Sequence, residues 1–150
     1  MEKQKPATDE LGCLEPFVGI WDTEGEMISD QSRSPVKFTA TDIYEWLPGG
    51  HFLLHRFDAD MPDGKVQGSE MIGYSQESRD YPMHSVDNLG KVSVMHAQHE
   101  GDIWTFTGEC IRFSGGFRDN GMVFAGLWEL RSDDGSSWQP WMQVRLRKKA

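Results

Sequence analysis

The sequence predicts an all-β protein in which about ten antiparallel strands form a closed up-and-down β-barrel. Runs rich in β-branched and aromatic residues alternate with short segments in which glycine accompanies proline, asparagine or aspartate. No segment between these runs has the length and apolar spacing of a crossover helix, so neighbouring strands are expected to be antiparallel. A series of hairpins leaves two unpaired edges unless the sheet closes, and closure favours a barrel.

The chain is expected to begin with an N-terminal segment over residues 1–16, followed by a single barrel domain over residues 17–150. A short helix is predicted over residues 9–18, with Asp9 as the candidate cap. Pro16 should keep this helix brief because proline is tolerated only in the first turn of a helix.

The strands follow from the hydrophobic runs, and the turns between them contain glycine or aspartate. They are expected near residues 20–28, 36–46, 51–59, 66–74, 81–87, 91–98, 102–108, 111–117, 122–131 and 137–147. Glycines within the strand patterns indicate bends, bulges or close backbone contacts of a curved sheet. They are Gly25, Gly68, Gly73, Gly108, Gly115 and Gly126.

Composition excludes several classes of function. The chain of 150 residues has 24 acidic and 15 basic side chains, a formal net charge of −9, which disfavours nucleic acid as a partner. The longest apolar run, near residues 123–128, is too short for a membrane span. The first six residues lack the apolar block of a secretory signal, so a cytoplasmic protein without a membrane partner is expected. Cys13 and Cys110 form no zinc or disulfide pattern.

The most favoured function is binding of a small apolar or aromatic molecule inside the barrel. Six tryptophans and eight methionines provide more large side chains than a tightly filled barrel of this size needs. Methionine adapts to irregular cavities, and tryptophan offers a flat apolar face with one hydrogen-bond donor. The aromatic and sulfur-containing candidates for the ligand-binding lining are Trp21, Tyr44, Tyr74, Trp104, Trp128 and Met142.

Either face of the strand near residues 51–59 could be the interior, because both faces mix apolar and polar residues. The favoured interpretation directs Phe52, Leu54 and Arg56 inward, with Arg56 as the anchor for an acidic group of the ligand. Glu70 on the next strand could then pair with Arg56 and offset the cost of burying its charge.

Histidines provide the alternative, an enzyme. His55, His84 and His96 are further candidates for the lining, and a histidine in the cavity could transfer protons at neutral pH. An isomerase, cyclase or hydrolase acting on the same apolar molecule therefore stays open, without an assigned catalytic residue. No metal or other cofactor is expected, because the histidine spacing does not make three imidazoles converge.

Several blocks of the chain resemble a bacterial family of unknown function with a lipocalin-like fold. A Gly-x-Trp motif at residues 19–21 is similar to the one that begins lipocalins and related calycin barrels. The blocks at residues 44–53, 68–74 and 128–138 complete the resemblance, which covers residues 17–148. It implies an antiparallel β-barrel and no established reaction.

The nitrobindin-like haem proteins also begin with Gly-x-Trp, and they make haem binding a third option. That resemblance implies an iron-ligating histidine on or beside the last strands. Residues 138–144 contain no histidine, and Met142 alone would be a weak ligand, so the option is disfavoured. The same exposed aromatic strand could instead pair two barrels in a homodimer.

Overall fold

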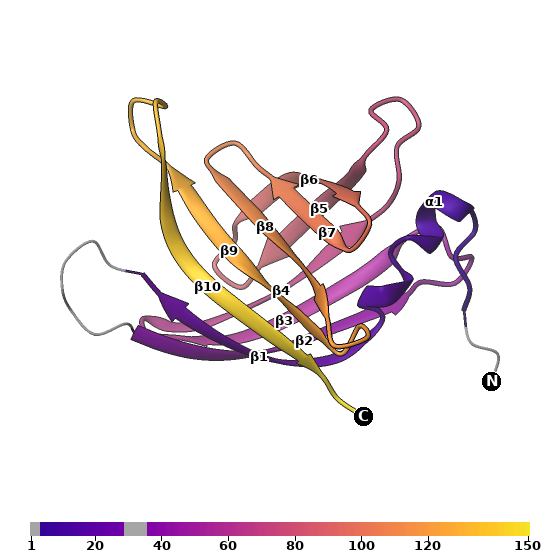
Figure 1. Ribbon diagram of the computed structural model, residues 1–150, viewed down its shortest axis with the longest axis horizontal. Coiled ribbons are helices and arrows are strands. Elements are labelled where there is room, and N and C mark those ends of the chain that lie inside the picture. The colour runs from indigo at the N-terminus through magenta and orange to yellow at the C-terminus, as the bar shows by residue number, and fades with distance from the viewer. Residues whose placement is uncertain (1–3, 29–35) are drawn as a thin grey trace.

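The computed structural model describes residues 4–28 and 36–150 and confirms the predicted fold. Ten antiparallel strands follow one another around a closed barrel (Figure 1). They are β1 (Gly19–Met27), β2 (Val36–Trp46), β3 (Leu53–Met61), β4 (Gly64–Ile72), β5 (Tyr81–Asp87), β6 (Val92–Glu100), β7 (Ile103–Thr107), β8 (Ile111–Arg118), β9 (Val123–Arg131) and β10 (Trp138–Lys148).

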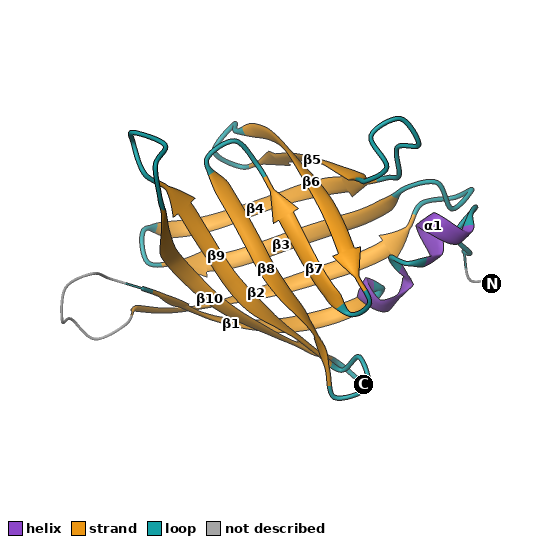
Figure 2. Cartoon of the chain, turned by 45° about the horizontal axis from the view of Figure 1, so that its top comes forward, coloured by secondary structure: helices purple, strands orange, loops and turns teal. Residues whose placement is uncertain are grey.

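The barrel closes because the first strand pairs with the last. The register of β1 on β10 runs from Trp21 opposite Lys148 to Met27 opposite Met142. A register shift between Pro140 and Met142 marks a bulge in β10, where proline has no amide hydrogen for the ladder. Figure 2 shows the strands β6 to β10 crossing over β2 to β4, which form the opposite wall.

The N-terminal segment covers one end of the barrel, which is called the closed end. The expected helix divides into α1 (Asp9–Gly12) and a 3₁₀ turn at Glu15–Phe17. The predicted Asp9 cap is wrong: Thr8 has the extended backbone of a cap, and its hydroxyl accepts from the Leu11 amide at 3.2 Å.

Two tryptophans and a tyrosine fasten this segment to the barrel. The indole of Trp21 donates to the carbonyl of Phe17 at 2.8 Å, and the indole of Trp46 donates to Glu15 at 2.6 Å. The Tyr81 hydroxyl donates to the backbone carbonyl of Glu10, also at 2.6 Å. These bonds satisfy polar atoms that would otherwise be buried without partners.

The core lies mainly at the closed end, with Phe17 at its centre. Its ring centroid is 4.9 Å from that of Phe117, 5.1 Å from Phe124 and 5.2 Å from Trp104, in edge-to-face arrangements. At the other end, which is called the open end, most residues on the inner face are only partly buried.

Three glycines lie in one row across β1, β9 and β8, together with Val144 of β10. Gly25 is opposite Val144, Val144 is opposite Gly126, and Gly126 is opposite Gly115. A Cβ at Gly25 would lie 2.1 Å from the Phe38 ring, and a Cβ at Gly126 would lie 2.5 Å from the Phe113 ring. The backbone of this glycine row therefore rests directly on aromatic rings inside the barrel.

Within the two described ranges, no helix has the length and apolar character needed to cross a membrane.

Candidate functional site

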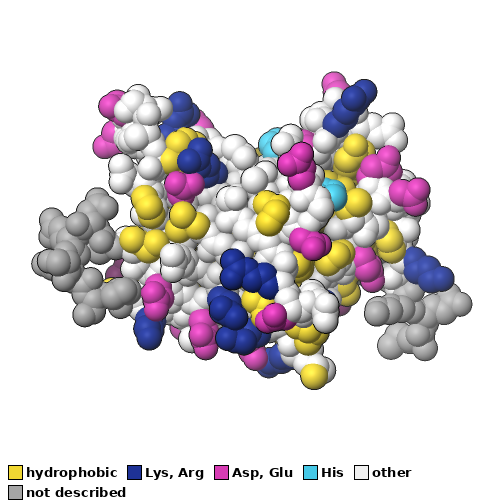
Figure 3. Space-filling view, viewed as in Figure 1, with side chains coloured by type: hydrophobic (Ala, Val, Ile, Leu, Met, Phe, Trp, Pro, Cys, Tyr) yellow, Lys and Arg dark blue, Asp and Glu magenta, His cyan; other side chains and the backbone are white. Residues whose placement is uncertain are grey.

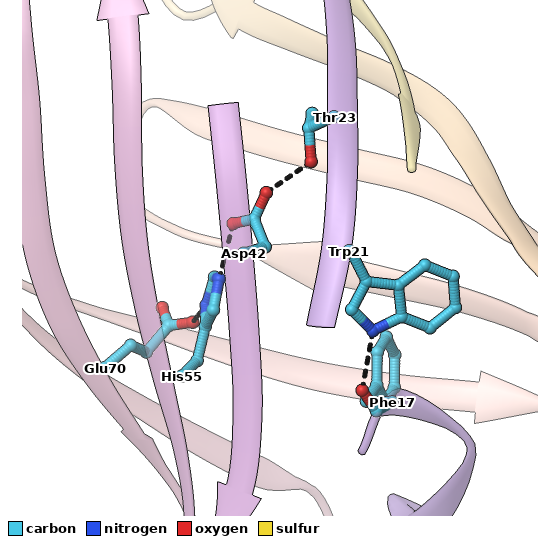
Figure 4. A network of polar contacts seen from close by, with 6 residues as sticks. All are labelled: Phe17, Trp21, Thr23, Asp42, His55 and Glu70. Carbon is cyan, nitrogen blue, oxygen red and sulfur yellow. Dashed lines mark hydrogen bonds and ion pairs between the residues drawn. The ribbon is translucent and has the colours of Figure 1, made fainter. Parts of the chain in front are cut away.

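A chain of four polar side chains crosses the inner wall of the barrel from β1 to β4 (Figure 4). The Thr23 hydroxyl donates to Asp42 Oδ2 at 2.5 Å, and Asp42 Oδ1 lies 2.7 Å from His55 Nε2. The other ring nitrogen, His55 Nδ1, lies 3.1 Å from Glu70 Oε1. This polar chain holds one imidazole between two carboxylates.

Strand alternation and register bring the four residues together. On β2 the inner face holds Asp42 between Ala40 and Tyr44, because successive side chains point to opposite faces. His55 is directly opposite both Tyr44 on β2 and Glu70 on β4. Cross-strand neighbours on one face are within contact distance, so four adjacent strands suffice to build the polar chain.

His55 is expected to be positively charged at neutral pH. Burial alone would lower its pKa, but hydrogen bonds and charge interactions with Asp42 and Glu70 outweigh burial and raise the pKa from 6.5 to about 9. With both carboxylates ionised, the polar chain has a formal charge of −1. The imidazolium thus balances one of the two buried negative charges.

Tyr44 forms one side of the site. Its ring stacks on the His55 ring, with the centroids 4.0 Å apart and the planes 5° apart. Burial, followed by the charges of Asp42 and Glu70, raises the pKa of Tyr44 well above 10, so the phenol stays protonated.

Part of the polar chain is accessible from inside the barrel. The side chains of His55 and Asp42 are each 13% exposed, and that of Glu70 is 6% exposed. In the described residues, the Tyr44 hydroxyl and Glu70 Oε2 have no hydrogen-bond partner, yet neither is a fully buried unsatisfied atom. These two atoms are therefore open to the polar group of a bound molecule.

The predicted orientation of β3 is wrong. The strand turns Leu53, His55 and Phe57 inward, whereas Arg56 points outward and donates to exposed Glu45 at 2.9 Å. The predicted Arg56 to Glu70 pair is therefore absent, and the guanidinium of Arg56 lies on the outside of the barrel.

Phe52 and Leu54 do not line the interior either. Phe52 precedes β3 and is half exposed, because a turn from Leu47 to Phe52 occupies the residues expected to start the strand. Leu54 alternates with buried Leu53 and so faces outward.

The other predicted site residues are buried in the core, partly buried on β9 and β10, or on the outside of the barrel. Trp21, Tyr44 and Trp104 are buried in the core, and Tyr74 packs against it with its ring 5.1 Å from that of Tyr81. Trp128 and Met142 are paired across β9 and β10 and are partly buried.

The other two histidines predicted for the lining lie on the outside. His84 is exposed and alternates with buried Met83, and His96 is exposed and contacts Asp80 at 3.0 Å. Of the three histidines predicted for the lining, only His55 reaches the interior.

Inner side chains are more deeply buried at the closed end than toward the open end. At the closed end, a void of about 10 Å³ lies among Leu14, Phe17, Tyr44, Ile72, Met83, Ala97, Trp104 and Phe106. That volume holds at most one water molecule. Toward the open end, the inner residues Met27, Phe57, Met95, Trp128 and Met142 are only partly buried.

No group of three or more histidine, cysteine, aspartate or glutamate side chains in the described part of the chain could hold a metal ion. Asp42 and Glu70 lie on opposite nitrogens of His55 rather than around a common point.

Sequence reasoning missed Thr23 and Asp42. The signal was present, because Asp42 shares the strand period of Phe38, Tyr44 and Trp46, which are large apolar side chains. A carboxylate in the middle of an apolar face needs a buried partner, and His55 is that partner.

Comparisons with known proteins agree with the fold. A family model described as "Protein of unknown function (DUF1579)" matches residues 7–145. The crystal structure of Rv2717c from M. tuberculosis is similar with a TM-score of 0.61 and 14% identity, covering 95% of this chain and 99% of that one, which shows a shared fold alone. A de novo designed fluorescence-activating β-barrel has a TM-score of 0.48 and 15% identity, covering 91% of this chain and 97% of that one. The search of curated protein sequences gives no match.

Proposed function

The chain belongs to the family described as protein of unknown function (DUF1579), and from its geometry we propose that it binds a small, largely apolar molecule in the open half of the barrel. The observation that carries this proposal is the polar chain. It lies on the inner wall, with accessible atoms, beside partly buried aromatic and methionine side chains. Apolar walls with a few placed polar groups are typical of small-molecule sites.

The polar atoms define the head group of the bound molecule. Glu70 Oε2 can only accept a hydrogen bond when ionised, and the Tyr44 hydroxyl can donate or accept. The polar chain has a formal charge of −1, as argued from the pKa of His55. A neutral or cationic head group that donates a hydrogen bond is therefore favoured over a carboxylate.

Binding explains the site better than acid/base catalysis does. Both nitrogens of His55 contact carboxylates, so the imidazole can accept or release a proton only after one contact breaks. The haem alternative has less support. His55 has both ring nitrogens in contact with carboxylates, and the inner His99 ring is stacked on Trp104, 4.4 Å between centroids, at the closed end, where the void of about 10 Å³ has no room for a haem.

The test uses Nile red, a neutral apolar dye, with two lysine substitutions at adjacent positions of β6. Met95→Lys puts a charge on the inner face, whereas Val94→Lys puts the same charge on the outer face. We expect the wild type and Val94→Lys to enhance the fluorescence of the dye equally. Met95→Lys should weaken binding at least about tenfold, because the ammonium must stay hydrated.

A decyl series then tests the head group. Decylamine and decanol should displace the dye at lower concentrations than decanoate does. Absence of dye binding, or equal losses in both lysine variants, would refute the interior site. Equal displacement by all three compounds would refute only the assignment of the head group.

A further inference from the structure

A large hollow lies on the outside of the barrel, not in its interior. It has a volume of about 870 Å³ and is formed by residues of β1, β2, β8, β9 and β10, with Ile103 of β7. Its lining consists of consecutive residues such as Glu24, Gly25 and Glu26, rather than the alternate residues that an interior cavity would show. This hollow is called the outer groove.

The glycine row explains why the wall is recessed there. Gly25, Gly115 and Gly126 all line the outer groove, and inside the barrel their backbone rests on the rings of Phe38 and Phe113. Because glycine has no side chain on the inner face, the backbone at this row lies closer to the interior of the barrel than the backbone around it. The groove is therefore built into the fold.

One side of the outer groove is basic. Arg118 and Arg145 line it, and Arg147 is adjacent, two residues beyond Arg145 on the same face. Figure 3 shows Lys and Arg side chains gathered at the centre of this face, around a hydrophobic side chain. None of the three arginines forms an ion pair with another described residue, on a chain whose net charge is −9.

Two of these arginines flank Val123 on the outer face of the sheet. Val123 is opposite Arg118 on one side and Arg147 on the other, and it is only 3% exposed although it alternates with inward-facing Phe124. Aliphatic stems of arginine cover apolar surface in this way while the charged ends reach solvent. Asp22 is opposite Arg147, but its carboxylate pairs with Lys149, so the guanidinium groups stay available to an anion.

The opposite side of the outer groove is acidic. Glu24 and Glu26 of β1 line it together with Lys37 of β2, which is opposite Glu26, so this side has one net negative charge. Glu24 is directly opposite Arg145 without forming an ion pair with it. These carboxylates repel an anion, so the anionic group belongs on the β8 to β10 side. Leu127 and Ile103 provide apolar contacts there.

We propose that the outer groove is a second binding site, separate from the barrel interior, for a small molecule that carries a phosphate or carboxylate group. Arg118 and Arg145 hold the anionic group through their planar guanidinium forks, which match both kinds of anion. The volume of the outer groove falls within the range of small-molecule sites, roughly 300–1,000 Å³.

Isothermal titration calorimetry with pyrophosphate and with citrate tests this site at low ionic strength. Binding is expected for at least one probe, and Arg118→Gln and Arg145→Gln should each weaken it about tenfold. Glu24→Gln should tighten binding several-fold by removing a competing carboxylate. Arg56→Gln is the matched control, because Arg56 is also exposed but lies on β3 and pairs with Glu45.

Absence of binding by both probes would overturn the proposal. Equal weakening by Arg56→Gln and Arg145→Gln would also overturn it, because it would indicate attraction to charge anywhere on the surface. Weaker binding by Glu24→Gln would refute a purely anionic ligand. Nile red fluorescence measured in the same samples should not change on adding either probe, so the two sites succeed or fail independently.

Discussion

The charge of His55 should make the stability of the protein fall as pH rises above neutral. The folded pKa of about 9 lies above the ordinary value of 6.5, so the folded protein keeps a proton that the unfolded chain loses. The stabilisation is fully present below pH 6.5 and is lost as pH rises toward 9. Its size is roughly 3 kcal/mol, with a slope of up to about 1.4 kcal/mol per pH unit.

The control for this prediction replaces the whole charged set by neutral amides. The triple variant Asp42→Asn, His55→Gln and Glu70→Gln retains the approximate shapes and should lose this pH dependence. His55→Gln alone should be less stable than the triple variant at pH 7, because it leaves two buried carboxylates without their cation. Removing one partner of a buried ion pair commonly costs about 3–5 kcal/mol.

Urea unfolding followed by tryptophan fluorescence, at intervals from pH 6 to 9.5, measures the free energy of unfolding of each form. The difference between the wild type and the triple variant isolates the polar chain, because the remaining histidines and cysteines are common to both. An NMR titration of the imidazole nitrogens gives the pKa of His55 directly. The prediction would be refuted if the free energy of unfolding changed equally with pH in the wild type and the triple variant, or if the pKa of His55 were near 6.5.

Three further predictions concern stability and are checked by the same urea unfolding at pH 7. Gly126→Ala should lower the free energy of unfolding by about 1–3 kcal/mol, because its Cβ would lie 2.4 Å from a backbone oxygen. The control Gly12→Ala should have little effect, because the nearest atom to its Cβ would be 3.8 Å away. Phe17→Ala should cost about 3–5 kcal/mol, since it leaves a cavity among five aromatic rings; a loss below 1 kcal/mol would contradict its central role in the core. Thr23→Val should cost about 1–2 kcal/mol by removing the donor to Asp42, and an unchanged stability would show that the bond contributes nothing.

The order and bounds of the strands could be predicted from the sequence because each turn depends on the few residues that form it. Asp119, Asn120 and Gly121 all adopt positive φ between β8 and β9, the conformation that such residues tolerate best. Every observed strand begins and ends within two residues of its expected position. The match over residues 7–145 confirms a family of unknown function, and the strand order confirms the barrel that the resemblance implies.

The inner face of β3 could not be read in the same way. Leu53, His55 and Phe57 form a set as mixed as the opposite one, so the choice depends on which neighbours each strand meets. His55 turns inward because Asp42 and Glu70 flank it on β2 and β4. The orientation of β3 thus depends on the pairing of three strands. The one sign of it in the sequence is Asp42, a carboxylate among apolar residues on one face of β2.

The pairing of β1 with β10 also has a consequence for how the protein is made. Residues 21–27 meet residues 142–148, so one hydrogen-bonding edge of β1 stays unpaired until residues 142–148 have been synthesised. Contacts between such distant segments slow folding, and the waiting edge is open to pairing with other chains. The N-terminal segment, by contrast, accepts hydrogen bonds from Trp21 of β1, Trp46 of β2 and Tyr81 of β5, so its docking depends on the sheet from β1 to β5. Detachment of this segment in urea should therefore indicate that the strands from β1 to β5 have separated.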